Sequence, residues 1–108
     1  MQYEVIFTPE ALEQIAALYR YIAVAASPNT AERYTNAIVT YCEGFHTSPL
    51  RGTCRDDIRP GLRITNFKGR TVIAFDVSET TVAIIGVFYG GQDYESALRP
   101  PTDWDISE

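Results

Sequence analysis

The residues best suited to binding or chemistry are basic side chains concentrated between Arg51 and Arg70, a segment that we call the basic belt. The belt holds six of the nine basic residues of the chain and only two acidic ones, Asp56 and Asp57, which gives a net charge of +4. The other residues comprise three basic and twelve acidic side chains, a net charge of −9, and the whole chain carries −5. A positive segment in an acidic protein indicates a surface for an anionic ligand or partner.

Cleavage of RNA is the reaction that such arginines suggest first, because Arg63 and Arg70 could hold a phosphate. The reaction also requires a general base and a general acid. No base accompanies these arginines, and the single histidine, His46, falls at the end of a predicted helix, where it would complement the helix dipole. The acidic balance of the chain further disfavours electrostatic seating on RNA. We therefore predict no catalytic residue and no sequence-specific binding of nucleic acid.

Two cysteines, Cys42 and Cys54, accompany that histidine. A structural zinc site takes four nitrogen or sulfur ligands, so no metal site is expected, and no cofactor motif is present. A disulfide is possible, but the sequence favours a reduced pair. The N-terminus is acidic where a signal peptide is basic, and no apolar run approaches the roughly 18 residues of a membrane span. These features predict a cytoplasmic protein that does not contact a membrane.

The first half of the chain is predicted to form a strand and two helices. Residues 2–7 alternate as a strand does. Thr8-Pro9 and Ser27-Pro28 each place a capping residue before a proline, as at helix starts. Apolar residues then recur at helical spacing over 9–26 and 28–46, which predicts an antiparallel helical hairpin.

The second half is predicted to form a three-stranded antiparallel meander at 62–67, 70–77 and 81–89. Pro60-Gly61 is typical of a type II turn, and Lys68-Gly69 of a two-residue hairpin loop. The fold class is therefore α+β, a single domain over residues 1–98 with an acidic, proline-containing tail at 99–108. The tail is expected to hang free or to pack only through Trp104.

The predicted loop sets the register of the meander, in which Phe67 pairs with Arg70. The hairpin would then cover a core face of the sheet, formed by Leu62, Ile64, Ile73, Phe75 and Val77. The opposite face would carry Arg63, Thr65, Arg70, Val72, Ala74, Asp76, Ala83, Ile85, Val87 and Tyr89. That second face is apolar as well, so either the tail or a partner is expected to cover it.

This order of elements resembles the RelE/ParE superfamily of toxins from bacterial type II toxin–antitoxin modules, and most closely the ParE-type branch. The resemblance covers residues 2–98. It rests on the belt motif GTCRDDIRPGLR at 52–63, on Arg70 at the start of the second meander strand, and on VFYGGQD at 87–93. Nuclease members of the RelE type tend to carry a Lys/Arg run before a C-terminal tyrosine. Here Gly90-Gly91-Gln92-Asp93 precedes Tyr94, which departs from that pattern.

The resemblance implies a toxin that inhibits DNA gyrase without being an enzyme and that a ParD-like antitoxin neutralises by folding onto it. Two alternatives stay open: a RelE-type ribosome-dependent mRNA endoribonuclease, and a non-toxic member that only binds antitoxin. The residues expected to contact the target or the antitoxin are Arg55, Arg59, Arg63, Arg70, Tyr89 and Tyr94. Asp56 and Asp57 offer a structural alternative for the belt, by pairing with Arg55 or Arg59, and the two tyrosines could simply pack in the core.

Overall fold

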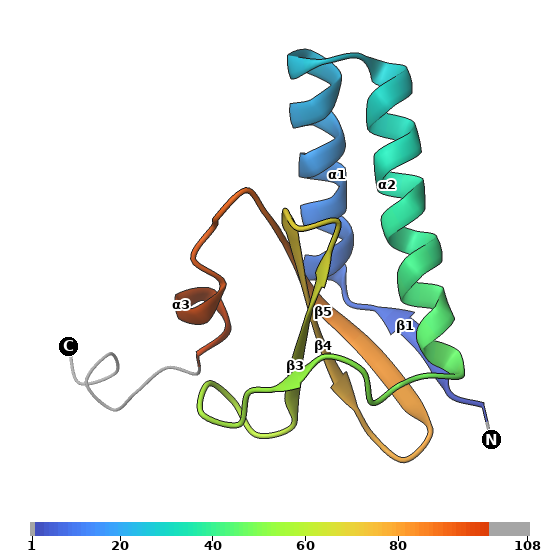
Figure 1. Cartoon of the computed structure of the whole chain (residues 1–108), viewed down its shortest axis with the longest axis vertical. Coiled ribbons are helices and arrows are strands. Elements are labelled where there is room, and N and C mark those ends of the chain that lie inside the picture. The colour runs from blue at the N-terminus through green and yellow to red at the C-terminus, as the bar shows by residue number, and fades with distance from the viewer. Residues whose placement is uncertain (1, 100–108) are drawn as a thin grey trace.

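The computed structural model describes residues 2–99 of the 108-residue chain (Figure 1). In chain order its elements are β1 (Glu4–Phe7), α1 (Pro9–Ala25), α2 (Pro28–Glu43), a 3-10 helix (Gly44–His46), β2 (Thr53–Cys54), β3 (Leu62–Phe67), β4 (Thr71–Val77), β5 (Thr81–Tyr89) and α3 (Tyr94–Leu98). The α+β class and the order of strand, hairpin and meander are as predicted. No helix within residues 2–99 is long and apolar enough to cross a membrane.

Both long helices begin at the predicted caps. The Thr8 hydroxyl oxygen accepts a hydrogen bond from the Ala11 N–H at 3.1 Å, and the Ser27 hydroxyl oxygen accepts one from the Thr30 N–H at 3.1 Å. A proline follows each cap, where its missing N–H costs nothing and its fixed φ suits the first helical turn. The two helices pack side by side as a hairpin (Figure 1). Local sequence therefore fixes where this layer starts.

A five-stranded sheet lies under the hairpin, in the order β1-β5-β4-β3-β2. The N-terminal strand β1 pairs in parallel with β5, while the other neighbours are antiparallel. The short strand β2 comes from the basic belt and forms one edge. The parallel pairing of β1 brings the two ends of the domain together.

The predicted register of β3 against β4 is wrong by one residue. Phe67 pairs with Thr71 rather than with Arg70, so Arg70 is an additional residue in the loop after Lys68 (φ 55°) and Gly69 (φ 75°). Side chains alternate between the two faces of a strand, so this shift inverts β3 relative to our prediction. Ile64 pairs with Ala74, on the face turned away from the hairpin.

A β-bulge in β5 changes the faces a second time. Val77 pairs with Val82 as predicted, but the register shifts between Ala74 and Phe75, which pair with Gly86 and Ile84. Beyond this bulge, Val87 and Tyr89 pack against the hairpin, contrary to the predicted alternation. Gly86 permits the local bend, because a Cβ there would lie 2.4 Å from the ring of Phe88.

The core consequently has two layers, one on each face of the sheet. The hairpin covers Phe67, Ile73, Phe75, Val82, Ile84 and Val87. On the other face, α3 lies away from the hairpin (Figure 1) and its Leu98 is 5% exposed. The residues buried with Leu98 are Ile58, Leu62, Ile64, Ala74 and Phe88.

This second layer corrects our assignment of Leu62 and Ile64 to the hairpin side. It also shows that α3 covers much of the face we expected a partner or the tail to cover, since Ala74 is fully buried there and Val72 and Ile85 are partly buried against the same cluster. Trp104, proposed to pack the tail, lies outside the described residues.

Candidate functional site

Arg55 is held in a cluster of hydrogen bonds that joins the belt to α3. Its Nε and Nη2 atoms donate to the two carboxylate oxygens of Asp57, both at 2.9 Å. Nη2 also donates to Glu95 at 3.0 Å, and Nη1 donates to the Tyr94 hydroxyl at 3.2 Å. The Arg55 side chain is only 24% exposed. Two of the predicted site residues, Arg55 and Tyr94, are therefore brought together, and Asp57 braces Arg55 as the structural alternative predicted.

The electrostatics of this cluster follow from those bonds. Hydrogen bonds to Asp57 and then to Glu95 raise the pKa of Arg55 above its ordinary value. The same contact lowers the pKa of Asp57, chiefly through the hydrogen bonds it accepts from Arg55. Both partners are therefore charged at neutral pH. With its donors occupied, Arg55 holds α3 on the sheet and has few donors left for a target.

Arg63 also has an internal role. Because of the register shift it pairs with Phe75 and lies on the hairpin side of the sheet, where we had placed it on the opposite face. Its Nε and Nη2 atoms donate to the carbonyl oxygens of Arg51, at 3.0 Å, and Leu50, at 2.8 Å. Arg63 thus fixes the loop that leads from α2 into the belt.

Arg51 and Arg59 complete the belt in different ways. The Arg51 guanidinium carbon lies 4.9 Å from the centre of the Phe45 ring and 5.3 Å from that of Tyr41, within cation–π range. Arg59 lies in the turn before Gly61, and its carbonyl accepts the Leu62 N–H at 3.1 Å. Its side chain makes no ion pair within residues 2–99. Of the two, Arg59 is the better placed for an external partner.

Arg70 and Tyr89, by contrast, line a cavity of about 550 Å³ between α1 and the C-terminal half of β5. The Tyr89 ring lies 6.0 Å from the rings of Tyr21 and Tyr34, so its packing is also structural. Arg70 is exposed and has no carboxylate within 4.0 Å among the described residues. The complete lining is Gln14, Ala17, Leu18, Tyr21, Arg70, Val87, Phe88, Tyr89, Gly90 and Gln92.

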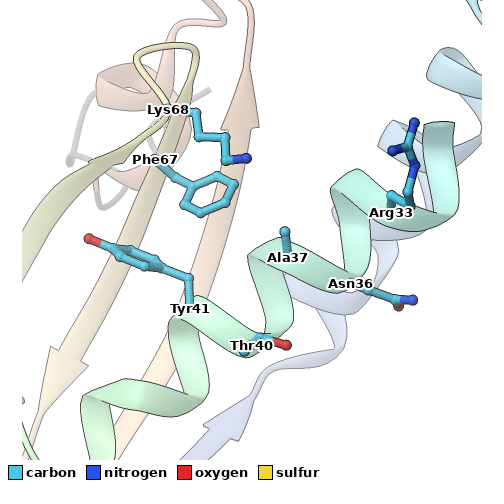
Figure 2. A pocket seen from close by; sticks show the side chains of 7 residues that line it. All are labelled: Arg33, Asn36, Ala37, Thr40, Tyr41, Phe67 and Lys68. Atoms are coloured by element: carbon cyan, nitrogen blue, oxygen red, sulfur yellow. The ribbon is translucent and has the colours of Figure 1, made fainter.

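A second, shallower cavity of about 530 Å³ lies between α2 and the loop after β3 (Figure 2). Figure 2 shows the aromatic side chains of Tyr41 and Phe67 facing one another across it, with Lys68 beside Phe67. The Lys68 ammonium lies 5.6 Å from the centre of that ring. The lining is Arg33, Asn36, Ala37, Thr40, Tyr41, Phe67 and Lys68, which makes it an apolar surface with two cations at its rim.

The six predicted site residues therefore do not form one site. Arg55 and Tyr94 belong to the α3 cluster, Arg63 supports a loop, and Arg59 lies in the belt turn. Only Arg70 and Tyr89 share a cavity. Along the strands, Arg70 and Arg63 are separated by about five residues, or roughly 16 Å, too far to hold one phosphate together.

Sequence reasoning missed three residues of these clusters: Gln14, Gln92 and Glu95. Gln14 accepts the Val87 N–H at 2.7 Å, Gln92 accepts the Tyr89 N–H at 2.9 Å, and Glu95 binds Arg55. Gln14 and Glu95 act over 73 and 40 residues of sequence, so no local pattern could have shown their roles. The Asp93-x-x-Ser96 cap of α3 was a readable signal for this helix. Within residues 2–99, no three His, Cys, Asp or Glu side chains gather as metal ligands.

Comparison with known proteins assigns the family. The family described as the ParE toxin of the type II toxin–antitoxin system parDE matches residues 5–94. The chain belongs to the ParE toxin family. A solved structure described as a chromosomal ParDE TA system from P. aeruginosa superposes with a TM-score of 0.72 at 19% sequence identity, covering 82% of this chain and 97% of that one. Curated protein sequences gave no significant match.

The match includes β1, the hairpin, the basic belt and the meander, and ends at the first residue of α3. The predicted ParE-type branch of the superfamily is thereby confirmed. The P. aeruginosa structure supports the fold of this ParE toxin, including the sheet on which the clusters above are built.

Proposed function

We propose that this ParE toxin inhibits DNA gyrase by binding it, acts in the cytoplasm, and is neutralised by a ParD-like antitoxin. The observation that carries the proposal is the family match over residues 5–94. The printed description of that family names a two-component system, parDE, which supports a partner of the ParD type.

The geometry of the predicted site residues supports binding rather than RNA cleavage. A ribonuclease needs a base, an acid and a cationic group around one phosphate. Here the Tyr94 hydroxyl is engaged by Arg55, and Arg63 is engaged by two backbone carbonyls. These side chains support the fold, which leaves Arg59 and Arg70 as the belt residues most available to a target.

Two assays on the purified protein test the proposal. Gyrase supercoiling should be inhibited, or cleaved DNA should accumulate, and the antitoxin encoded beside the toxin gene should restore activity. Ribosome-bound mRNA should remain intact at the same protein concentration. Cleavage of that mRNA with gyrase unaffected would assign the endoribonuclease alternative, and no effect in either assay would indicate a non-toxic member that only binds antitoxin.

Arg59→Glu and Arg70→Glu are the variants suited to locating the target surface. Both side chains lack an ion pair within the described residues, so charge reversal should reduce inhibition while the thermal unfolding midpoint stays near that of the wild type. Arg63→Glu is the structural comparison. It should lower the unfolding midpoint because it removes the donors to the Leu50 and Arg51 carbonyls.

A further inference from the structure

The C-terminal half of β5 has an edge without a neighbouring strand. β5 has nine residues, whereas β1 has four and pairs only with Thr81–Ile84. The Thr8 N–H donates to the Ile84 carbonyl at 3.0 Å, and the chain then turns into α1. From Val87 to Tyr89, β5 therefore continues past the end of β1, with β4 as its only strand neighbour within residues 2–99.

Two side-chain amides occupy the hydrogen-bonding positions that a strand would take at this edge. Val87 N–H donates to Oε1 of Gln14 on α1, and Tyr89 N–H donates to Oε1 of Gln92. The two donors are two residues apart, which is the spacing of groups that point to the same edge of a strand. Replacing a glutamine oxygen by a backbone carbonyl exchanges one hydrogen bond for another of similar strength, so a partner strand could displace both glutamines at little cost.

The edge opens into the cavity of about 550 Å³ described above. Four consecutive residues of β5 and its end, 87–90, line it, as expected where a backbone edge faces open space. Tyr21 on α1 is 60% exposed and offers an aromatic surface above this edge. Arg70 supplies a cation with no carboxylate partner among the described residues. The site thus combines backbone donors, an aromatic surface and one free positive charge.

We propose that an extended segment of the antitoxin binds in this cavity as an additional strand. Its backbone pairs with β5 at Val87 and Tyr89, in line with β1, and an acidic side chain contacts Arg70. The inference rests on the antitoxin partnership proposed above and assigns that partner a place and a chemistry. Single-stranded nucleic acid could also stack on Tyr21, but one cation in a chain of net charge −5 disfavours a polyanion.

The test uses the full-length toxin and the antitoxin encoded beside its gene. Isothermal titration measures the affinity for wild type, for Arg70→Glu and for Lys68→Glu. Lys68 is the matched control, because it is exposed in the same loop but lies outside this cavity. Arg70→Glu should weaken binding by about tenfold or more, and Lys68→Glu by much less.

Hydrogen exchange on the wild-type complex tests the strand directly, without any variant. The Val87 and Tyr89 amides should exchange at least about tenfold more slowly in the complex, and the side-chain amide resonances of Gln14 and Gln92 should shift as both are released. A complex that forms with these signals unchanged and with equal affinity for both variants would overturn this docking site but leave the antitoxin partnership standing.

Two other outcomes also decide the matter. Failure of any complex to form would overturn the partnership and the docking site together. Binding of a 12-nucleotide single-stranded DNA or RNA that Arg70→Glu abolishes, with no antitoxin contact at β5, would reassign the cavity to nucleic acid.

Discussion

Arg55 is the residue that links the basic belt to the C-terminal helix. A planar guanidinium with donors in a fixed fork can serve Asp57, Glu95 and Tyr94 at once, whereas a lysine ammonium is a single point on a flexible stem. The belt therefore uses one of its positive charges inside the molecule. Charge alone would have assigned that residue to a target.

We predict that Arg55→Lys loosens α3 without affecting the hairpin. The α3 amides, such as that of Leu98, should exchange faster with solvent, while amides of α1 and α2 keep their protection, because only the ties to Glu95 and Tyr94 are lost. Arg59→Lys, in the same belt but without an ion pair within residues 2–99, is the control. Unchanged exchange in α3 of Arg55→Lys would contradict this role.

A pH dependence follows from the same cluster. The pKa of Asp57 is lowered in the folded protein by hydrogen bonds from Arg55, so its contribution is present above the unfolded pKa of about 4 and is lost as the pH falls through the folded value. Asp93, whose pKa is lowered by bonds from Ser96 at the α3 cap, has the same sign.

Wild-type protein should therefore lose stability in the acidic range, below about pH 4, with α3 affected first. The measurement is the thermal unfolding midpoint, together with α3 amide exchange, between pH 7 and pH 3. Asp57→Asn should lower the midpoint at pH 7 and show a shallower fall on acidification. Parallel curves for the two proteins would exclude this contribution of Asp57.

At the scale of elements, the loop into β2 is the most constrained backbone of the belt. Gly52 has φ of +79°, and a Cβ there would lie 2.4 Å from the carbonyl oxygen of Ile64 on β3. Only glycine allows this close approach, so the edge strand β2 depends on it.

Gly52→Ala is expected to destabilise the protein by more than Gly69→Ala. Gly69 has a similar φ of +75° but open space around its Cβ position, so its variant carries only the left-handed backbone cost of about 1–2 kcal/mol. Gly52→Ala adds displacement of the β3 backbone. Urea unfolding of both variants gives the difference, and equal losses would show that the contact with Ile64 is unimportant.

The elements themselves were predictable, whereas their faces were not. Caps, prolines and periodicity are local, so the helix starts at Pro9 and Pro28 and the strand at 62–67 were predicted correctly. The register depends on whether Arg70 belongs to the loop or to the strand, and the dipeptide Lys68-Gly69 does not decide this. The bulge did have a signal, a glycine at position 86 inside an apolar strand pattern.

The candidate site was predicted less well than the fold, for the same physical reason. Arg55 meets Tyr94 across 39 residues, and Gln14 meets Val87 across 73. Such contacts follow from the packed arrangement of sheet, hairpin and α3 rather than from residue spacing. Charge identified the belt, but only the fold separates Arg55 and Arg63, which support structure, from Arg70, which faces a cavity.

For the whole molecule, the predicted domain of residues 1–98 has a clear consequence for truncation. We expect a chain ending at Arg99 to unfold with nearly the free energy of the full chain, because it keeps both core layers. A chain ending at Asp93 keeps the Gln92 contact to Tyr89 but loses Tyr94 and Leu98. Removing Leu98 alone, as Leu98→Ala, should cost about 2–5 kcal/mol, since this side chain is 5% exposed. The shorter chain should lose at least as much and should bind a dye specific for apolar surface, because Phe88, Ala74 and Ile64 become accessible. Urea unfolding of the three proteins distinguishes the cases: equal stability of both truncated chains would remove α3 from the domain, and a large loss at Arg99 would extend the domain beyond residue 98.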